Sequence, residues 1–237
     1  PGGHQPMHSR SGRYVIAYNG EIYNYKSLRA ELGKEGLYFA TESDTEVLLA
    51  SIETWGLEQA LKRLAGMFAF SLVDLKEGVL HLVRDRMGEK PLYYGCQGDV
   101  FLFGSELKSM RMHPAWNGGI NLEAVSQMLQ LSYIPSPKTI YPNIYKLSPG
   151  SMVSVSFHGD KFGEPIHSVW WAYDEMIHRN SGYYIGASVS EMESELSEVL
   201  ARVIAEQQVA DVPLGGFLSG GIDSSLIIAT MQEISHR

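Results

Sequence analysis

The sequence predicts an α+β domain built on packed β-sheets, followed by the beginning of an α/β domain with a parallel sheet. Two apolar, β-rich runs, residues 66–74 and 79–85, are separated by a Lys-Glu-Gly turn, as expected for neighbouring strands of a sheet sandwich. Near the end of the sequence, a helical pattern, a short apolar run and a glycine-rich loop that opens a second helix follow one another. That order is typical of the start of a parallel α/β sheet.

Composition places the chain among ordinary globular proteins. The 237 residues are 44% hydrophobic and 19% charged, which is enough to bury a sizeable core. The net charge of −8, without any cluster of Lys and Arg, disfavours a nucleic-acid or anionic-membrane surface. No apolar run approaches the roughly 20 residues of a membrane span. The single cysteine, Cys96, excludes an internal disulfide framework and fits a reducing cytoplasm.

Strand and helix patterns follow one another through the first part of the chain. Residues 1–11 are rich in Gly, Pro and His and are expected to form an exposed loop. Strands are expected at residues 13–18, 66–74, 79–85 and 152–157, and helices at 24–33, 43–55, 57–64 and 121–131. We therefore expect a first domain at residues 1–157, an irregular linker at 158–187 and a second domain at 188–237.

The second domain is expected to open with a helix. Ser190 and Glu193 have the spacing of a capping box, in which each side chain bonds the other residue's backbone. The apolar run that begins at Val212 is then expected to form a short buried strand. A helix is expected from Ser224 to about Ser235.

Residues 218–225, with the sequence Leu-Ser-Gly-Gly-Ile-Asp-Ser-Ser, are expected to bind phosphate. Gly220 and Gly221 let the backbone approach a ligand, and the first amides of the following helix favour an anion. Side chains add hydroxyl donors and one carboxylate for Mg²⁺: Ser219, Ser224, Ser225 and Asp223. The lysine of the kinase-type loop is missing. An ordinary strand-to-helix turn is the alternative interpretation.

Asn19-Gly20-Glu21 follows the predicted strand at residues 13–18 directly. Asn-Gly is a strong hairpin signal, so a simple tight turn is one interpretation. However, a helical pattern follows instead of a partner strand. A turn that exposes an amide nitrogen, a glycine N–H and a carboxylate at a strand end suits a binding site at least as well.

Ser43, Asp44 and Glu46 open the next helix. Ser43 and Glu46 have capping-box spacing, and a carboxylate in the first turn is favourable with the helix dipole. These effects are a complete structural reason for the three residues. On this chemistry alone, Asp44 is a helix-start residue more often than a ligand.

Several segments together resemble glutamine-hydrolysing asparagine synthetases, in which a class II glutamine amidotransferase domain precedes a pyrophosphate-loop synthetase domain. The similar segments are Asn19-Gly20-Glu21-Ile22-Tyr23-Asn24, residues 84–94, residues 103–109, residues 133–140 and the loop at 219–225. They run in family order along nearly the whole chain. The resemblance implies an N-terminal-nucleophile (αββα sandwich) glutaminase domain, followed by the beginning of an α/β parallel-sheet ATP pyrophosphatase domain.

The resemblance also implies roles for individual residues. The side chain of Asn19 and the N–H of Gly20 would form an oxyanion hole, and Glu21 and Asp44 would bind the α-amino group of glutamine. ATP would bind to Leu218, Ser219, Gly220, Gly221, Asp223, Ser224 and Ser225, with Asp223 on the Mg²⁺ ion. Structural roles at the domain interface are expected for Arg84, Asp85, Glu106 and Lys108.

Cys96 is not expected to be the nucleophile. It lies in a predicted turn, residues 94–99, with no nearby histidine or helix N-terminus to lower the pKa of its thiol. In the family, the nucleophile is the N-terminal cysteine of the mature chain, and its own α-amino group is the base. That cysteine and the arginine segment that binds glutamine are absent. We therefore expect a fragment that lacks them and most of the synthetase domain, and that alone does not hydrolyse glutamine.

The reaction implied for the parent protein is transfer of the glutamine amide nitrogen to aspartate. ATP would adenylate the β-carboxylate of aspartate, and ammonia would displace AMP to give asparagine. The expected partners are glutamine, ATP and aspartate, with a homodimer as candidate assembly, in the cytoplasm and without nucleic acid or membrane. Two alternatives stay open: a related amidotransferase acting on another carboxylate or a polysaccharide-precursor sugar, and a degenerate domain that serves as a scaffold.

Overall fold

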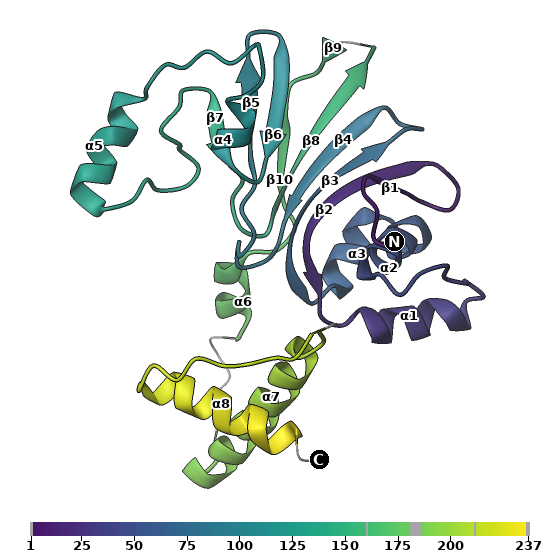
Figure 1. The fold of residues 1–237 in the computed structure, drawn as a ribbon, viewed down its shortest axis with the longest axis vertical. Helices are drawn as coiled ribbons and strands as arrows, with labels where there is room; N and C mark the ends of the chain where they lie inside the picture. Colours follow the sequence, from purple (N-terminus) through teal and green to yellow (C-terminus); the bar gives the residue numbers. More distant parts are fainter. Residues whose placement is uncertain (1, 160, 181–185, 211, 236–237) are drawn as a thin grey trace. The chain divides into compact units, whose positions relative to one another are not determined.

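The structure, a computed structural model, describes residues 2–159, 161–180, 186–210 and 212–235 (Figure 1). The chain divides into two compact units, Pro1–Asp174 and Glu175–Arg237. The first unit holds the predicted sheets, and the second consists of helices and connecting segments. Among the residues that the structure describes, no helix has both the length and the apolar character needed to cross a membrane.

The first unit is built on an antiparallel seven-stranded sheet in the order β1-β2-β3-β4-β8-β10, with β9 paired to β8. Its strands are β1 (Met7–His8), β2 (Tyr14–Ile22), β3 (Gly66–Asp74), β4 (Val79–Arg84), β8 (Ser151–His158), β9 (Lys161–Phe162) and β10 (Ile166–Val169). The strands predicted at residues 66–74 and 79–85 are neighbours, which confirms the interpretation of the turn between them.

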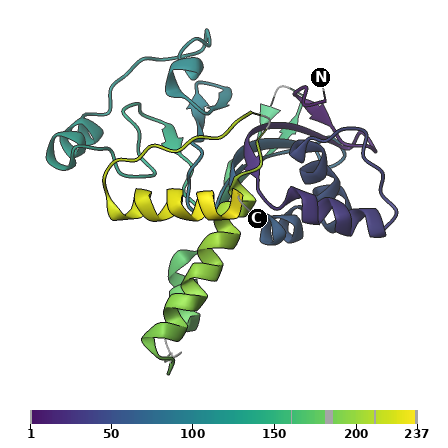
Figure 2. The ribbon, with the colours of Figure 1, turned by 60° about the horizontal axis from the view of Figure 1, so that its bottom comes forward.

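Helices cover one face of this sheet (Figures 1 and 2). They are α1 (Tyr25–Lys34), α2 (Asp44–Trp55) and α3 (Leu57–Arg63), close to the predicted bounds. Their apolar sides pack with inward-facing residues of β2 and β3 in one core, where Ile16, Leu48 and Phe68 are fully buried. This burial supplies the main driving force for docking the helices on the sheet.

A second sheet packs on the other face. It has the order β6-β5-β7, with β5 (Tyr93–Gln97), β6 (Val100–Gly104) and β7 (Ile144–Lys146). Leu82 of the large sheet and Tyr94 of the small one belong to the core between them. The short helix α4 (Leu107–Met110) lies outside the small sheet, where Met110 packs with Leu102 and Ile144. The layers therefore run helix, sheet, sheet, helix, as the αββα expectation requires.

Helix α5 (Leu122–Leu131) begins as predicted, because the side chain of Asn121 accepts a hydrogen bond from Ala124 N at 3.2 Å. Its apolar side chains are nevertheless mostly exposed, with Leu122 at 78% and Leu129 at 82%. Only Ala124 of this helix is buried. Periodicity therefore predicted the helix but not its burial, which depends on what packs against it.

The predicted turn at Asn19-Gly20-Glu21 is wrong. These residues continue β2, which pairs with β3 from Tyr14 opposite Asp74 to Ile22 opposite Gly66. Gly20 is needed here for space, since a Cβ atom would lie 2.3 Å from the carbonyl oxygen of Met67. The partner strand is distant in the sequence, so the local Asn-Gly signal could not reveal the pairing.

Two other segments also differ from expectation. Cys96 lies within β5 rather than in a turn, and the chain reverses afterwards at Gly98, whose φ is +60°. The segment predicted as an irregular linker, residues 158–187, contains β9, β10 and most of α6 (Tyr173–Asn180). Because β9 and β10 pair with β8, the first compact unit continues to Asp174.

In the second unit, α7 (Val189–Gln207) and α8 (Ile222–Ser235) cross each other (Figures 1 and 2). The capping box uses Ser188 and Glu191, two residues before the predicted Ser190 and Glu193. Both pairs have the required spacing, and the earlier one lets the helix form additional backbone hydrogen bonds. Residues 212–217 form no strand, since a strand needs a partner and the described residues of this unit contain none.

Candidate functional site

Gly20 presents its N–H at an open edge of the large sheet. In antiparallel pairs, successive residues point alternately toward and away from the partner strand. The bond from Tyr23 N to Ala65 O, 2.8 Å long, sets this alternation, so the N–H of Gly20 points away from β3. Tyr18 N points the same way and donates to Gln5 Oε1 at 2.6 Å. Because β1 ends before it reaches Gly20, that N–H has no strand partner among the described residues.

Asn19 lies beside this free N–H with an exposed side chain. Its Nδ2 donates to Ser105 Oγ at 3.3 Å, across from the end of β6. Both residues line a pocket of about 190 Å³ together with Gln5, Leu92 and Phe103. The site therefore offers two neutral N–H donors, from a side chain and a main chain, at the rim of a small pocket.

Two carboxylates lie near the same edge. Asp44 Oδ2 accepts from the hydroxyl of Tyr18 at 2.8 Å and from Ile22 N at 3.0 Å. Burial raises the pKa of Glu21, the charge of Asp44 raises it further, and the charge of Lys90 lowers it. Glu21 and Asp44 thus repel each other, and a cationic group bound between them would relieve that repulsion.

The start of α2 holds Asp44 in place. Ser43 caps the helix by accepting from Thr45 N at 3.2 Å, as predicted. Glu46 does not complete the capping box, because it accepts from Ala40 N and Thr41 N, both at 2.7 Å. These bonds fix the segment before the helix instead, so the direction from which the chain reaches Asp44 is set by Glu46.

Arg84 and Asp85 do not pair with each other but support the loop that carries Lys90. Both are buried, and each bonds to backbone groups. Arg84 donates to the carbonyl oxygens of Gly88, Lys90 and Leu147. Asp85 accepts from the amides of Phe68, Met87, Glu89 and Lys90. Their roles are structural, as expected, whereas Glu106 and Lys108 form an exposed ion pair at 2.7 Å.

The glycine-rich loop lies at the N-terminus of α8. Gly220 has φ +81°, a left-handed conformation that glycine adopts without strain. Ser225 N donates to Gly221 O at 3.2 Å, and the hydroxyls of Ser224 and Ser225 donate to the same oxygen at 3.1 and 2.8 Å. The hydroxyls of Ser219 and Ser224 lie 2.8 Å apart. The serines predicted to face phosphate therefore bond within the loop here.

The residues of this loop fit an anionic ligand. Asp223 lies in the first turn of α8, next to backbone N–H groups that have no helical partner. Leu218 is 67% exposed, so the loop is open to solvent on that side. Within the described ranges, no group of three or more His, Cys, Asp or Glu side chains is placed to hold a metal ion. A single carboxylate is nevertheless the usual protein contribution to a Mg²⁺ ion that phosphate oxygens also bind.

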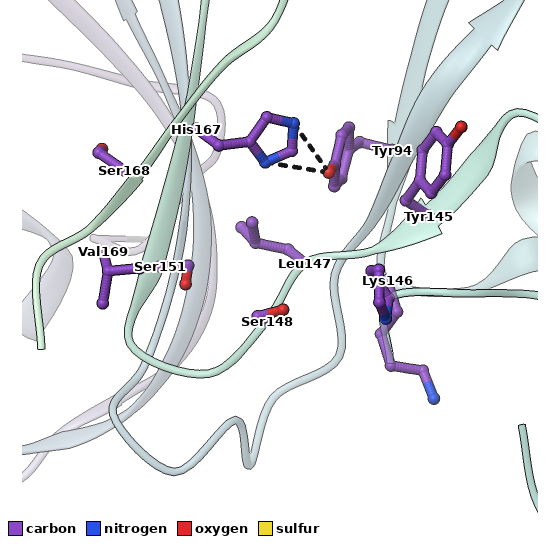
Figure 3. A pocket seen from close by; sticks show the side chains of 10 residues that line it. Tyr94, Tyr145, Lys146, Leu147, Ser148, Ser151, His167, Ser168 and Val169 are labelled. Atoms are coloured by element: carbon purple, nitrogen blue, oxygen red, sulfur yellow. Dashed lines mark hydrogen bonds between the residues drawn. The ribbon is translucent and has the colours of Figure 1, made fainter. Parts of the chain in front are cut away.

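A larger pocket, of about 410 Å³, lies elsewhere in the first unit, and none of the predicted site residues lines it (Figure 3). Tyr94, Tyr145 and His167 form an aromatic wall, while the side chain of Lys146 points away from them. The hydroxyl of Tyr94 lies 3.4 Å from both ring nitrogens of His167. Burial and the neighbouring Tyr145 raise the pKa of Tyr94 to about 12, so its hydroxyl stays neutral.

The predicted residues form two groups. Asn19, Gly20, Glu21 and Asp44 lie together at one end of β2, and residues 218–225 form one loop in the second unit. Sequence reasoning missed Tyr18 and Lys90 and gave Ser105 no contact with Asn19. Ser105 lies in a segment already noted for its resemblance, but the contact between residues 19 and 105 depends on the packing of two sheets.

Comparison with known families and proteins adds independent information. Residues 1–171 match the family described as glutamine amidotransferase domain, and residues 195–237 match asparagine synthase. Asparagine synthetase [glutamine-hydrolyzing] 1 of Bacillus subtilis (strain 168) is 36% identical over 98% of this chain and 34% of its own length. Putative asparagine synthetase [glutamine-hydrolyzing] 2 of Methanocaldococcus jannaschii is 35% identical over 93% of this chain and 41% of its own.

More distant proteins are also similar. Amidase chry2 of Gibberella zeae is 29% identical over 99% of this chain and 33% of its own length. The solved structure of glutamine phosphoribosylpyrophosphate amidotransferase from B. subtilis has a TM-score of 0.48 and 20% identity, covering 97% of this chain and 47% of that one. The chain spans about a third of the length of the curated relatives that match it.

Proposed function

The chain belongs to the glutamine amidotransferase domain family, and we propose that the native gene product containing it makes asparagine from glutamine, aspartate and ATP. Glutamine would be hydrolysed in the first unit, and its nitrogen would be transferred to aspartate, with release of AMP and pyrophosphate. The observation that carries this proposal is the meeting of two N–H donors and two carboxylates at one end of β2.

Glutamine fits this edge in one orientation. Its α-ammonium group would lie between the carboxylates of Glu21 and Asp44, where it relieves their repulsion. Its side-chain carbonyl oxygen would face Asn19 Nδ2 and Gly20 N–H. Two donors that face a carbonyl oxygen stabilise the negative charge that develops on it when a nucleophile attacks the amide.

The nucleophile is not Cys96. In this structure Cys96 is a strand residue of β5, distant in register from the donors of β2. Partial burial and the charge of Glu164 raise the pKa of its thiol, which lowers the fraction of reactive thiolate. The proposed nucleophile is the N-terminal cysteine that the family resemblance implies.

The loop at residues 218–225 is the proposed ATP site. The amides of the first turn of α8 would bind the phosphates, and the hydroxyls that now donate to Gly221 O would turn toward phosphate oxygens. Asp223 would hold Mg²⁺, whose charge offsets that of the phosphates. The match of residues 195–237 to asparagine synthase supports this assignment.

A second function uses the same first step. Amidase chry2 is similar to this chain over 99% of its length, so the fold of the chain does not identify the acceptor of the nitrogen. An amidotransferase acting on another carboxylate is therefore the alternative. For either function we propose a cytoplasmic, homodimeric enzyme that does not bind nucleic acid, supported by one cysteine and a net charge of −8.

One assay separates these functions. The native gene product is supplied with glutamine, ATP, Mg²⁺ and aspartate, and glutamate, asparagine and pyrophosphate are measured together. Equal amounts of asparagine and pyrophosphate, lost when aspartate is omitted, support asparagine synthesis. Glutamate release without asparagine supports a different acceptor. A protein that releases no glutamate under any of these conditions contradicts both functions.

A further inference from the structure

We propose that Ser105 is a positioning residue that orients the Asn19 carboxamide toward the developing oxyanion. The inference rests on the proposed glutaminase function, because it assigns a role to a residue that acts only through Asn19. It is carried by one contact between segments far apart in the sequence, Asn19 Nδ2 to Ser105 Oγ at 3.3 Å.

The contact leaves Asn19 with one free N–H. A carboxamide nitrogen has two hydrogens, and the bond to Ser105 uses one of them. The second hydrogen then points in a direction fixed by the first. Without this bond, the exposed side chain could rotate about its broad terminal torsion and turn its oxygen toward the substrate. An amide oxygen facing an oxyanion would raise the barrier, so orientation of Asn19 matters more than its presence nearby.

Ser105 is itself held firmly. It follows β6, whose last residue, Gly104, pairs with Tyr93 of β5. The chain then turns into α4, and a Cβ atom on Gly104 would lie 3.1 Å from Ser109 Oγ and 3.4 Å from Met110 Cγ. Met110 is only 3% exposed and anchors α4 in a core cluster. The serine is thus presented by two rigid elements, as a positioning residue must be.

A purely structural role makes a different prediction. The Asn19–Ser105 bond joins β2 of the large sheet to the end of β6 of the small sheet, so it could serve only as a tie between them. A tie would affect stability without affecting turnover. However, both residues line the small pocket beside the free N–H of Gly20, where a ligand would displace solvent. A bond at that position acts on whatever the pocket binds.

The test measures glutamine hydrolysis by the native gene product and its variants. Ser105→Ala removes the acceptor and is expected to lower kcat by about tenfold, the effect of one well-placed hydrogen bond, while KM changes less than about twofold. Ser105→Thr keeps the hydroxyl and is expected to restore most of kcat. In the double variant Asn19→Ala/Ser105→Ala, kcat is expected to equal that of Asn19→Ala alone, since Ser105 has nothing left to orient.

Ser109→Ala is the matched control. Ser109 also carries a hydroxyl in this segment, but that hydroxyl donates to Glu106 O at 2.7 Å and makes no printed bond to Asn19. Ser109→Ala is expected to keep the wild-type kcat even if it lowers the melting temperature. An unchanged kcat in Ser105→Ala, or losses that add up in the double variant, would overturn the inference alone. Absence of glutamine hydrolysis by the wild-type protein would overturn the proposed function and this inference with it.

Discussion

The hydroxyl of Tyr18 donates to Asp44 Oδ2 at 2.8 Å and thereby joins the middle of β2 to the first residue of α2. The same oxygen accepts from Ile22 N at 3.0 Å, so it is held from two sides. The other oxygen has only a 3.5 Å contact with the Thr45 hydroxyl. Burial and the charge of Asp44 raise the pKa of Tyr18, which therefore remains a donor at neutral pH. The carboxylate is thus oriented before any ligand binds.

Removing this donor should weaken glutamine binding. In Tyr18→Phe, Asp44 keeps its charge but loses one of the two bonds that orient it, so KM for glutamine should rise about three- to tenfold with little change in kcat. Steady-state hydrolysis by the native gene product checks this. Tyr14→Phe is the control, because Tyr14 lies on the same face of β2 and its hydroxyl makes no printed hydrogen bond. Equal effects in both variants would contradict the role of Tyr18.

The pH dependence of glutamine hydrolysis should report on Glu21. Its pKa is raised by burial and by Asp44, so the ionised form that binds an ammonium group is lost on acidification at a higher pH than for an ordinary glutamate. Lys90 lowers this pKa, and Lys90→Met should therefore move the acid limb of kcat/KM to still higher pH. Lys108→Met, which removes an exposed lysine paired with Glu106, should leave the limb unmoved. A shift in the opposite direction would contradict the assignment.

Gly20→Ala should be harmful to both stability and activity. The added Cβ would lie 2.3 Å from Met67 O and 2.7 Å from Phe68 Cα, so β2 must separate from β3. We expect a loss of about 1–3 kcal/mol in the free energy of unfolding, as in other overpacked sites, and loss of glutamine hydrolysis. Urea unfolding measures the first. Gly33→Ala is the control, because a Cβ there meets nothing within 4 Å and alanine favours the helix.

Asp74 should stabilise the fold in a pH-dependent way. Burial would raise its pKa, but bonds from Arg13 (Nη2 to Oδ2, 2.6 Å) and from the amides of Lys76 and Glu77 outweigh burial and lower it. A lowered pKa means that the stabilisation is present at neutral pH and is lost as pH falls through that pKa. Asp74→Asn should cost about 1–3 kcal/mol at pH 7 in urea unfolding, with the difference shrinking in acid. Asp99→Asn, at an exposed turn, should show no such difference.

Asp223→Ala should separate the two proposed activities. Removal of the carboxylate from the first turn of α8 should abolish ATP-dependent asparagine formation, because Mg²⁺ would lose its protein ligand. Glutamate release should continue, since Asp223 lies in the second unit and the glutamine residues lie in the first. Both products are measured in the same reaction. Loss of both activities in a correctly folded variant would contradict the separation.

Local signals in the sequence predicted most of the helices and strands. Asn121 and Ser43 cap helices as their side chains suggest, and the runs at 66–74 and 79–85 form neighbouring strands. Such features depend on residues a few positions apart, so they can be read without knowing the fold. The same holds for the glycine-rich loop before α8, whose Gly220 adopts a left-handed conformation. The resemblance to the family added candidate residues that these local rules alone did not single out.

The sequence by itself determined the elements and named Asn19, Gly20, Glu21 and Asp44, but only the tertiary structure decided how they meet. Strand pairing, not local turn propensity, turns the N–H of Gly20 away from β3. The packing of two sheets brings Ser105 to Asn19, 86 positions away in the chain. The docking of α2 brings Asp44 to Tyr18, and neighbouring charges then set the pKa of Glu21. Contacts between distant segments carry no local sequence signal, because they arise from the burial of whole elements against one another.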